Sequence, residues 1–485
     1  MSETNSIKFN FIMNTFLTLS SFLFPLITFP YVSRILLPAG MGRVSFATSV
    51  VSYFALFAQL GIPTYGIRAC AKVRDDRTEL TRVVHELFVI NLAMSIFAYV
   101  LLVLAIFCVP RLRMEKTLIL IISVTVIFNA VGMEWLYKAL EQYTFITVRS
   151  LIFKVIGLVF LFLLVHEAED VVIYGGITCF AASASSVANF LHVHHYIGMK
   201  PVGGYRFRRH FKAVLVFFAM SCATVIYTNL DTVMLGFMKT DEEVGYYHAA
   251  VKVKTILVSV VTSLGTVLLP RLSYYVEQGK KQEFERLAKK AMNFVVMLAL
   301  PLMIYFILFA REGILFLSGS AYKNAVLPMQ IIMPTLLFIG MTNVMGIQIL
   351  VPAGKEKTVL VSEIAGAVTD LAANAVLIPK LASAGAAIGT LLAEFVVWLV
   401  QFFAVKHVVD RTYEQVRWFC LFPALAAAGF SCVWVKCLSA GDFVKLIFSA
   451  VMFFGVYFLV LAAVKEPLVT ELKNQMAAHI RSRGK

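Results

Sequence analysis

The stretch that decides the fold covers residues 94–109 and reads MSIFAYVLLVLAIFCV. It carries no charged side chain, and residues 155–165, VIGLVFLFLLV, are equally apolar. A helix needs about 20 mostly apolar residues to cross a bilayer, and backbone groups in hydrocarbon must pair internally. Because the apolar residues are continuous and do not alternate with period two, these runs predict membrane-spanning helices and exclude the strands of a membrane barrel.

The composition extends this interpretation to the whole chain. Of the 485 residues, 60% are hydrophobic and 15% are charged, whereas soluble domains hold about 45–50% apolar and about 25% charged residues. The seven cysteines form no CxxC pair and lie mostly in apolar runs, so we interpret them as small hydrophobic residues of membrane helices. Residues 11–33 have no small-residue cleavage site and predict a first span, not a signal peptide.

Hydropathy along the chain predicts about fourteen transmembrane helices joined by short connections. The predicted spans are 11–36, 42–62, 83–109, 116–138, 141–165, 170–196, 211–238, 244–270, 286–310, 323–351, 357–378, 383–405, 415–437 and 443–464. The even number of spans predicts that both termini lie on one side of the membrane. The short connections leave no room for a soluble domain.

The distribution of basic residues indicates which side that is. If the termini are cytoplasmic, 28 of the 43 Lys and Arg residues fall on the cytoplasmic side, 10 fall outside and five fall within spans. This asymmetry is typical of the positive-inside rule, and it accounts for most of the net charge of +15 without a nucleic-acid partner. One outer loop, with Arg111, Arg113 and Lys116, disagrees with the rule.

An internal repeat predicts the domain organisation. Residues 77–84 (RTELTRVV) align with residues 281–288 (KQEFERLA), and Gly42 aligns with Gly245 at nearly the same offset. The offset covers six spans, so the copies have the same orientation in the membrane. We therefore expect two pseudo-symmetric six-helix lobes and an extra C-terminal helical pair. The predicted domains are residues 1–210, 211–406 and 407–485.

Four stretches resemble a known family. They are residues 30–36 (PYVSRIL), 134–143 (EWLYKALEQY), 348–355 (QILVPAGK), and 374–379 (NAVLIP) together with 385–390 (GAAIGT). In this order they are similar to the polysaccharide-exporter branch of the multidrug/oligosaccharidyl-lipid/polysaccharide flippase superfamily. One departure is Leu37, where that family usually has glycine, so the loop is expected to be less flexible here.

This resemblance implies a two-lobed transporter that works by alternating access and has a central cavity. It implies a flippase that moves undecaprenyl-diphosphate-linked oligosaccharide from the inner to the outer leaflet of the bacterial cytoplasmic membrane, for surface polysaccharide biosynthesis. The implied partners are the polyprenyl-diphosphate-linked sugar, membrane lipids, H⁺ or Na⁺ as a coupling ion, and the polysaccharide polymerase machinery. No cofactor is expected.

Charged residues within the spans are the candidate site residues, because a charge at membrane depth costs about 2.5–3.5 kcal/mol on insertion scales. Arg34, Arg149, Lys154 and Lys252 are the candidates for binding the diphosphate, since Arg and Lys are the usual phosphate partners. For Arg34 and Lys252 the alternative is snorkelling to the outer interface. Two acids within the spans are candidates for ion coupling or for pairing with these bases, namely Asp231 and Glu394.

Other functions remain open at this point. A multidrug or cation antiporter of the same fold, or a lipid II flippase, would differ mainly in the substrate. A membrane-embedded glycosyltransferase would need paired carboxylates on a substantial loop, and we find none, so no catalytic residue is assigned. The histidines of residues 192–195 (HVHH) are interpreted as a solvated interfacial cluster, because adjacent histidines on a helix diverge, and no metal site is expected.

Overall fold

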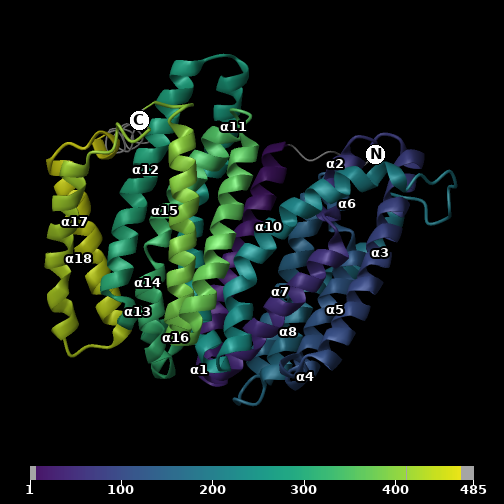
Figure 1. Cartoon of the computed structure of the whole chain (residues 1–485), viewed down its shortest axis with the longest axis horizontal. Coiled ribbons are helices and arrows are strands. Elements are labelled where there is room, and N and C mark those ends of the chain that lie inside the picture. The colour runs from purple at the N-terminus through teal and green to yellow at the C-terminus, as the bar shows by residue number, and fades with distance from the viewer. Residues whose placement is uncertain (1–6, 411, 471–485) are drawn as a thin grey trace, which may run out of the picture. The chain divides into compact units, whose positions relative to one another are not determined.

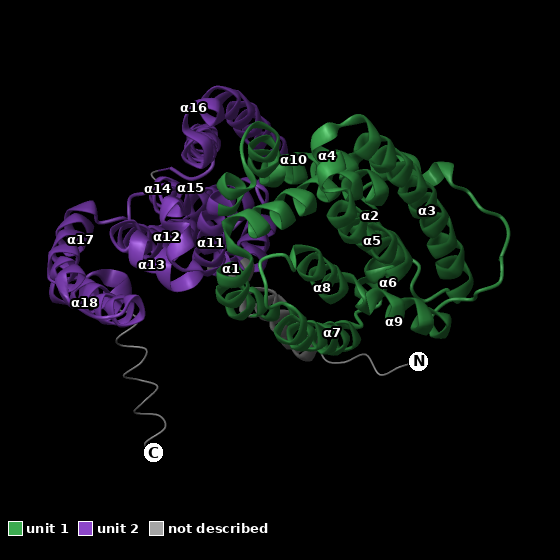
Figure 2. Cartoon of the chain, turned by 90° about the horizontal axis from the view of Figure 1, so that it is seen from below, with its two compact units in different colours: residues 1–245 green, residues 246–485 purple. Residues whose placement is uncertain are grey.

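The computed structural model describes residues 7–410 and 412–470. Within these residues it contains helices and no strand. The chain divides into two compact units, residues 1–245 (unit 1) and residues 246–485 (unit 2), which Figure 2 shows in different colours. The predicted lobe boundaries at 210 and 406 follow the repeat and the loops. These boundaries stay predictions, because the two units are defined by contacts within the fold and the predicted lobes by an internal sequence repeat.

The lengths of the helices agree with a membrane protein. Ten of the described helices are long and apolar enough to cross a bilayer, or eleven if Ser320–Ile332 and Thr335–Leu350, bent by 44°, count as one span. The helix Glu356–Val405 has 50 residues, which at 1.5 Å per residue exceeds twice the roughly 30 Å of hydrocarbon. The prediction of an all-α polytopic membrane protein is confirmed, and the helices are consistent with fourteen crossings.

Unit 1 is a bundle of helices, most of which are labelled in Figure 1. Its helices are α1 (Ile7–Gln59), α2 (Ile62–Ala71), α3 (Arg77–Cys108), α4 (Pro110–Met114), α5 (Lys116–Gly132), α6 (Glu134–Ala139), α7 (Tyr143–Leu164), α8 (Val171–Ser183), α9 (Ser185–His192), α10 (Arg208–Met238) and the start of α11 (Asp241–Glu277). Helix α1 packs against α3, α5, α7 and α10, and α5 also packs against α8. These contacts bring helices that are distant in sequence around one space.

Helix α1 is two helices joined at a break. Leu37 has φ 59° and ψ 176°, which interrupts the helical backbone between the two predicted spans 11–36 and 42–62. The following residue is Pro38, and its ring disfavours the helical conformation in the residue before it. The break therefore follows from the local sequence, and it gives the second half of α1 its own direction.

A buried ionic network anchors α10 to α2 and α3. The carboxylate of Glu86 on α3 is fully buried and accepts a hydrogen bond from Arg209 Nε at 2.9 Å. Its Oε2 also lies 2.7 Å from His210 Nε2, and His210 Nδ1 lies 2.8 Å from the Tyr65 hydroxyl of α2. A buried charge is stable only when it is paired and hydrogen-bonded. This network fixes one end of α10, the helix that closes one side of the site described below.

Unit 2 is a second helical bundle. Besides the rest of α11, its helices are α12 (Lys281–Leu308), α13 (Ala310–Ser318), α14 (Val326–Ile332), α15 (Thr335–Thr342), α16 (Glu356–Val405), α17 (Trp418–Val433) and α18 (Asp442–Ala463). Helix α12 packs against α15 and α17, and α16 packs against α14 and α15. Ala382, with φ 48° and ψ −126°, breaks α16 between the predicted spans 357–378 and 383–405.

Candidate functional site

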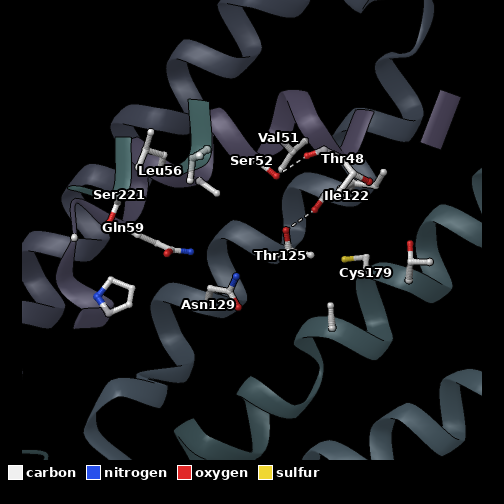
Figure 3. Close-up of a pocket in the computed structure, with 16 residues that line it drawn as sticks. Thr48, Val51, Ser52, Leu56, Gln59, Ile122, Thr125, Asn129, Cys179 and Ser221 are labelled. Atoms are coloured by element: carbon white, nitrogen blue, oxygen red, sulfur yellow. Dashed lines mark hydrogen bonds between the residues drawn. The ribbon is translucent and has the colours of Figure 1, made fainter. Parts of the chain in front are cut away.

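A cavity of about 540 Å³, called the polar cavity below, lies in unit 1 (Figure 3), and its lining combines uncharged polar side chains with apolar ones such as Val51, Leu56 and Ile122. Its volume falls within the roughly 300–1,000 Å³ that is usual for small-molecule sites. Among the described residues that line it, none is charged. The polar residues of the lining are Thr48, Ser52, Gln59, Thr125, Asn129, Thr178, Cys179 and Ser221.

Helical spacing places these side chains around one space. Thr48, Ser52 and Gln59 follow one face of the second half of α1. Thr125 and Asn129 are four residues apart on α5, and residues three or four apart lie on the same face of a helix. Helices α8 and α10 supply the remaining sides, through residues 178–182 and 221–225. Because α1, α5, α8 and α10 all contribute, the cavity depends on the packing of the whole unit.

Four of the five hydroxyl groups in the described lining donate their protons to backbone carbonyls of their own helices. Ser52 Oγ donates to the Thr48 carbonyl at 2.8 Å, and Thr125 Oγ1 donates to the Ile122 carbonyl at 2.8 Å. Thr178 and Ser221 make the equivalent bonds to Gly175 and Phe217, at 2.8 and 3.0 Å. A hydroxyl has one proton and two lone pairs. These side chains therefore present acceptor capacity to the cavity.

Two amides complete the lining. The side chains of Gln59 and Asn129 extend into the middle of the space (Figure 3). In the part of the chain that the structure describes, no hydrogen bond joins either amide to another protein group. Each amide has two donor hydrogens and a carbonyl acceptor. Together with the hydroxyls, they make a neutral surface that both donates and accepts hydrogen bonds.

The predicted basic residues of unit 1 lie outside this lining. Arg34 is exposed on the first half of α1, and its Nη1 donates to the Pro30 carbonyl at 3.0 Å. Lys154 on α7 donates from Nζ to Ser20 Oγ at 2.9 Å, and its Nζ lies 5.9 Å from the centre of the Phe24 ring. Lys154 therefore has a polar partner and an aromatic neighbour on the first half of α1.

Arg149 is the most buried of the predicted bases, with 5% of its surface exposed. One of its terminal nitrogens donates to the Ser185 carbonyl, where α8 gives way to α9. The other lies 3.7 Å from Glu134 Oε2, and the guanidinium lies 5.8 Å from the centre of the Phe145 ring. These contacts give Arg149 a packing role that the sequence did not indicate. Its predicted part in substrate binding stays a prediction.

The other predicted residues are divided between the units. Asp231 is buried on α10 within unit 1. Lys252 is half-buried on α11 and Glu394 is buried on α16, both within unit 2. None of the six predicted site residues belongs to the lining of the cavity. Their roles in binding and coupling therefore stay predictions.

Sequence reasoning missed the cavity because it searched for charges. The available signal was the helical spacing of uncharged polar side chains within otherwise apolar spans, such as Ser52 and Gln59, or Thr125 and Asn129. Of the residues that the structure describes, no three His, Cys, Asp or Glu side chains are grouped to hold a metal ion. In the histidine cluster, His192 stacks on Phe145 with ring centres 4.5 Å apart.

The helical architecture is that of a multi-pass membrane protein. Its fold is similar to that of the lipid II flippase MurJ in an inward closed conformation, with a TM-score of 0.73, 16% identity, and coverage of 94% of this chain and 100% of that one. It is also similar to an inward-facing multidrug resistance MATE family transporter of the MOP superfamily. The TM-score is 0.63 and the identity 13%, with coverage of 80% of this chain and 94% of that one.

Sequence comparison narrows the class. The family model described as polysaccharide biosynthesis protein matches residues 7–276, and the model named MatE matches residues 177–376. The chain belongs to the polysaccharide biosynthesis protein family, which lies in the polysaccharide flippase branch of the MOP superfamily.

Two relatives carry the name of an O-antigen transporter. The relative from Escherichia coli (strain K12) is 23% identical over 340 residues, which is 70% of this chain and 82% of the relative. The relative from Shigella dysenteriae is 23% identical over 414 residues, which is 80% of this chain and 97% of the relative.

Proposed function

We propose that this protein is a flippase for polyprenyl-diphosphate-linked oligosaccharide. It moves the undecaprenyl-linked sugar from the inner to the outer leaflet of the bacterial cytoplasmic membrane by alternating access, as part of surface polysaccharide biosynthesis. Family membership supports the class of transporter, and the names of the two relatives support a saccharide as cargo. The protein works as a transporter and not as an enzyme.

The observation that carries this proposal is the cavity in unit 1 whose described lining is uncharged and includes hydroxyl and amide groups. Neutral hydroxyl and amide groups match the hydroxyl groups of sugars, because both sides donate and accept hydrogen bonds. A multidrug or cation antiporter would instead need acidic groups where the cation binds, and none lines this cavity. A lipid II flippase remains the second candidate, supported by the similarity of the fold to MurJ.

The diphosphate needs cationic partners, and we assign them to Arg34, Arg149, Lys154 and Lys252. A base at membrane depth is costly unless an anion compensates it, and a diphosphate does so only while substrate is bound. Asp231 and Glu394 then serve as charge partners in the empty carrier, or carry the coupling H⁺ or Na⁺. Contact with the polysaccharide polymerase machinery belongs to the same proposal.

Complementation tests the proposal. Cells that lack their own oligosaccharide flippase receive the wild-type chain or one variant at matched protein level, and export of the lipid-linked sugar is measured. We expect Arg34→Ala, Lys154→Ala and Lys252→Ala each to reduce export. Arg34→Lys should restore it in part, because the charge is kept and the bidentate geometry of arginine is lost. The matched control is Lys200→Ala, in an exposed loop, with full export expected.

Two results would contradict different parts of the proposal. No export by the wild-type chain, with protein present in the membrane, would reject the flippase for that substrate. Full export by all three alanine variants would remove these bases from the site and leave the flippase itself standing.

A further inference from the structure

Two cavities in unit 1 differ sharply in chemistry. The polar cavity of about 540 Å³ combines the amides of Gln59 and Asn129 with hydroxyl groups. A second cavity of about 420 Å³ is lined by α3 and α5 with residues such as Leu92, Ile96 and Val100. A polyprenyl chain is a hydrocarbon and is most stable against apolar groups. The two surfaces therefore suit different parts of an amphipathic substrate.

The polar cavity is also unsuited to the diphosphate. Each phosphate group is anionic, and an anion removed from water requires a cation or several donors. The described lining has no basic side chain, and the hydroxyl protons of Ser52, Thr125, Thr178 and Ser221 are already bonded to backbone carbonyls of their own helices. What remains are acceptor lone pairs, the Thr48 hydroxyl and two amide groups, which together suit a neutral ligand that is both donor and acceptor.

We propose that the cavity lined by Gln59, Asn129, Thr125, Ser52 and Ser221 is a saccharide subsite, which holds neutral sugar units of the lipid-linked oligosaccharide during transport. This proposal rests on the flippase function and adds the position of the sugar. Sugar hydroxyls donate to the lone pairs of the serine and threonine oxygens. The two amides both donate to and accept from the sugar, whose hydroxyl groups take the place of water.

A native cysteine allows a direct test of occupancy. Cys179 lines the cavity on α8, whereas Cys222 on α10 follows the lining residue Ser221 and is not itself part of the lining. Two forms of the full chain are prepared, one with Cys179 and one with Cys222 as the only cysteine. Each is treated with a small neutral thiol reagent in membranes, and the rate of modification is measured with and without ligand.

The ligands separate the possible occupants. The first ligand is the undecaprenyl-diphosphate-linked oligosaccharide that is exported in the complementation assay. The second is undecaprenyl diphosphate without sugar. At a concentration ten times the dissociation constant, about 90% occupancy should slow modification of Cys179 about tenfold with the first ligand only. Cys222 should react at the same rate in all conditions. Equal protection of Cys179 by the sugar-free lipid, or protection by neither, would overturn the subsite.

Variants of the two amides give an independent measurement. We expect Gln59→Ala and Asn129→Ala each to raise the half-saturating substrate concentration roughly two- to tenfold, which corresponds to the loss of one or two hydrogen bonds. Gln278→Ala, an exposed glutamine in the loop between α11 and α12, is the control of the same residue type. Unchanged transport by the double variant would reject the subsite, while transport by the wild-type chain would still support the flippase.

Discussion

At the scale of single residues, Leu37 has a backbone conformation that leucine rarely adopts. Its φ of 59° and ψ of 176° lie in a region that is essentially restricted to glycine. The sequence resemblance had already marked this position, because the family usually has glycine there. The structure places Leu37 at a break within α1 and not in a loop, and the predicted lower flexibility stays a prediction.

Replacement of Leu37 by glycine is expected to stabilise the protein. Backbone strain of this kind costs about 1–3 kcal/mol, and glycine loses about 0.5–1 kcal/mol in conformational entropy. The leucine side chain is 43% exposed, so little packing is lost. We therefore expect Leu37→Gly to raise the free energy of unfolding by about 1 kcal/mol, measured by chemical unfolding in detergent micelles.

The control at this position is Leu37→Ala, which keeps a Cβ in the same strained conformation and should give no gain. Leu36→Gly, at a buried helical neighbour, should destabilise the protein. If Leu37→Gly behaved like Leu36→Gly, the break in α1 would not be strained.

At the scale of elements, a very close helix contact in unit 1 joins the second half of α1 to the start of α11. A Cβ at Gly42 would lie 1.8 Å from the Asp241 carbonyl oxygen, and one at Gly245 would lie 2.0 Å from the Pro38 carbonyl oxygen. Small residues let membrane helices approach closely. The two glycines are also the pair aligned by the internal repeat, and they lie against one another in the fold. The repeat itself stays a prediction.

Substitution at this crossing is expected to separate the two helices. Gly42→Ala places a methyl group where backbone atoms already lie, so we expect a loss of about 1–3 kcal/mol in the free energy of unfolding. Gly455→Ala on α18 is the matched control, because no described atom beyond its own stretch of helix lies within 4 Å of the position that its methyl group would take. That control should keep or increase stability, since alanine favours helix by about 1 kcal/mol over glycine. Equal stability of both variants would show that the crossing tolerates a side chain.

At the scale of the whole molecule, the distribution of charge has one exception, and the structure supplies a reason for it. Arg111 in the loop predicted to be outside donates from Nε to the Gly236 carbonyl at 2.8 Å and pairs with Asp241. Arg113 donates to the Phe107 carbonyl. Both arginines therefore make contacts within unit 1, which is a structural role besides any effect on topology.

The topology prediction follows from the remaining basic residues. In a cysteine-free background, Val202→Cys, Lys280→Cys and Gln475→Cys should react with a membrane-impermeant reagent only in inverted vesicles, because both termini are predicted to be cytoplasmic. Position 475 lies outside the described residues. Ser439→Cys, between α17 and α18, is the control that should react in intact cells. Reaction of any of the first three from outside would reject the fourteen-span arrangement.

The sequence by itself determined the class of this protein. Hydropathy is a local property, so apolar runs such as 94–109 predict spanning helices before any packing is known. The break at residue 37 also had a local signal in Pro38, and the four family-like stretches indicated the flippase branch. For the candidate site, however, sequence reasoning reached only the charged residues, because charge within a span is visible without a fold.

Only the tertiary structure decided where polar groups converge. Gln59 and Asn129 are far apart in the sequence, and they share a cavity because α1, α5, α8 and α10 pack with particular faces toward one another. The partner of Arg149, the Ser185 carbonyl, lies 36 residues away for the same reason. Helix rotation and crossing depend on side-chain packing summed over the whole unit. A hydropathy pattern therefore predicts the length of each helix. Which helices contact each of its faces is decided by side-chain packing in the folded unit.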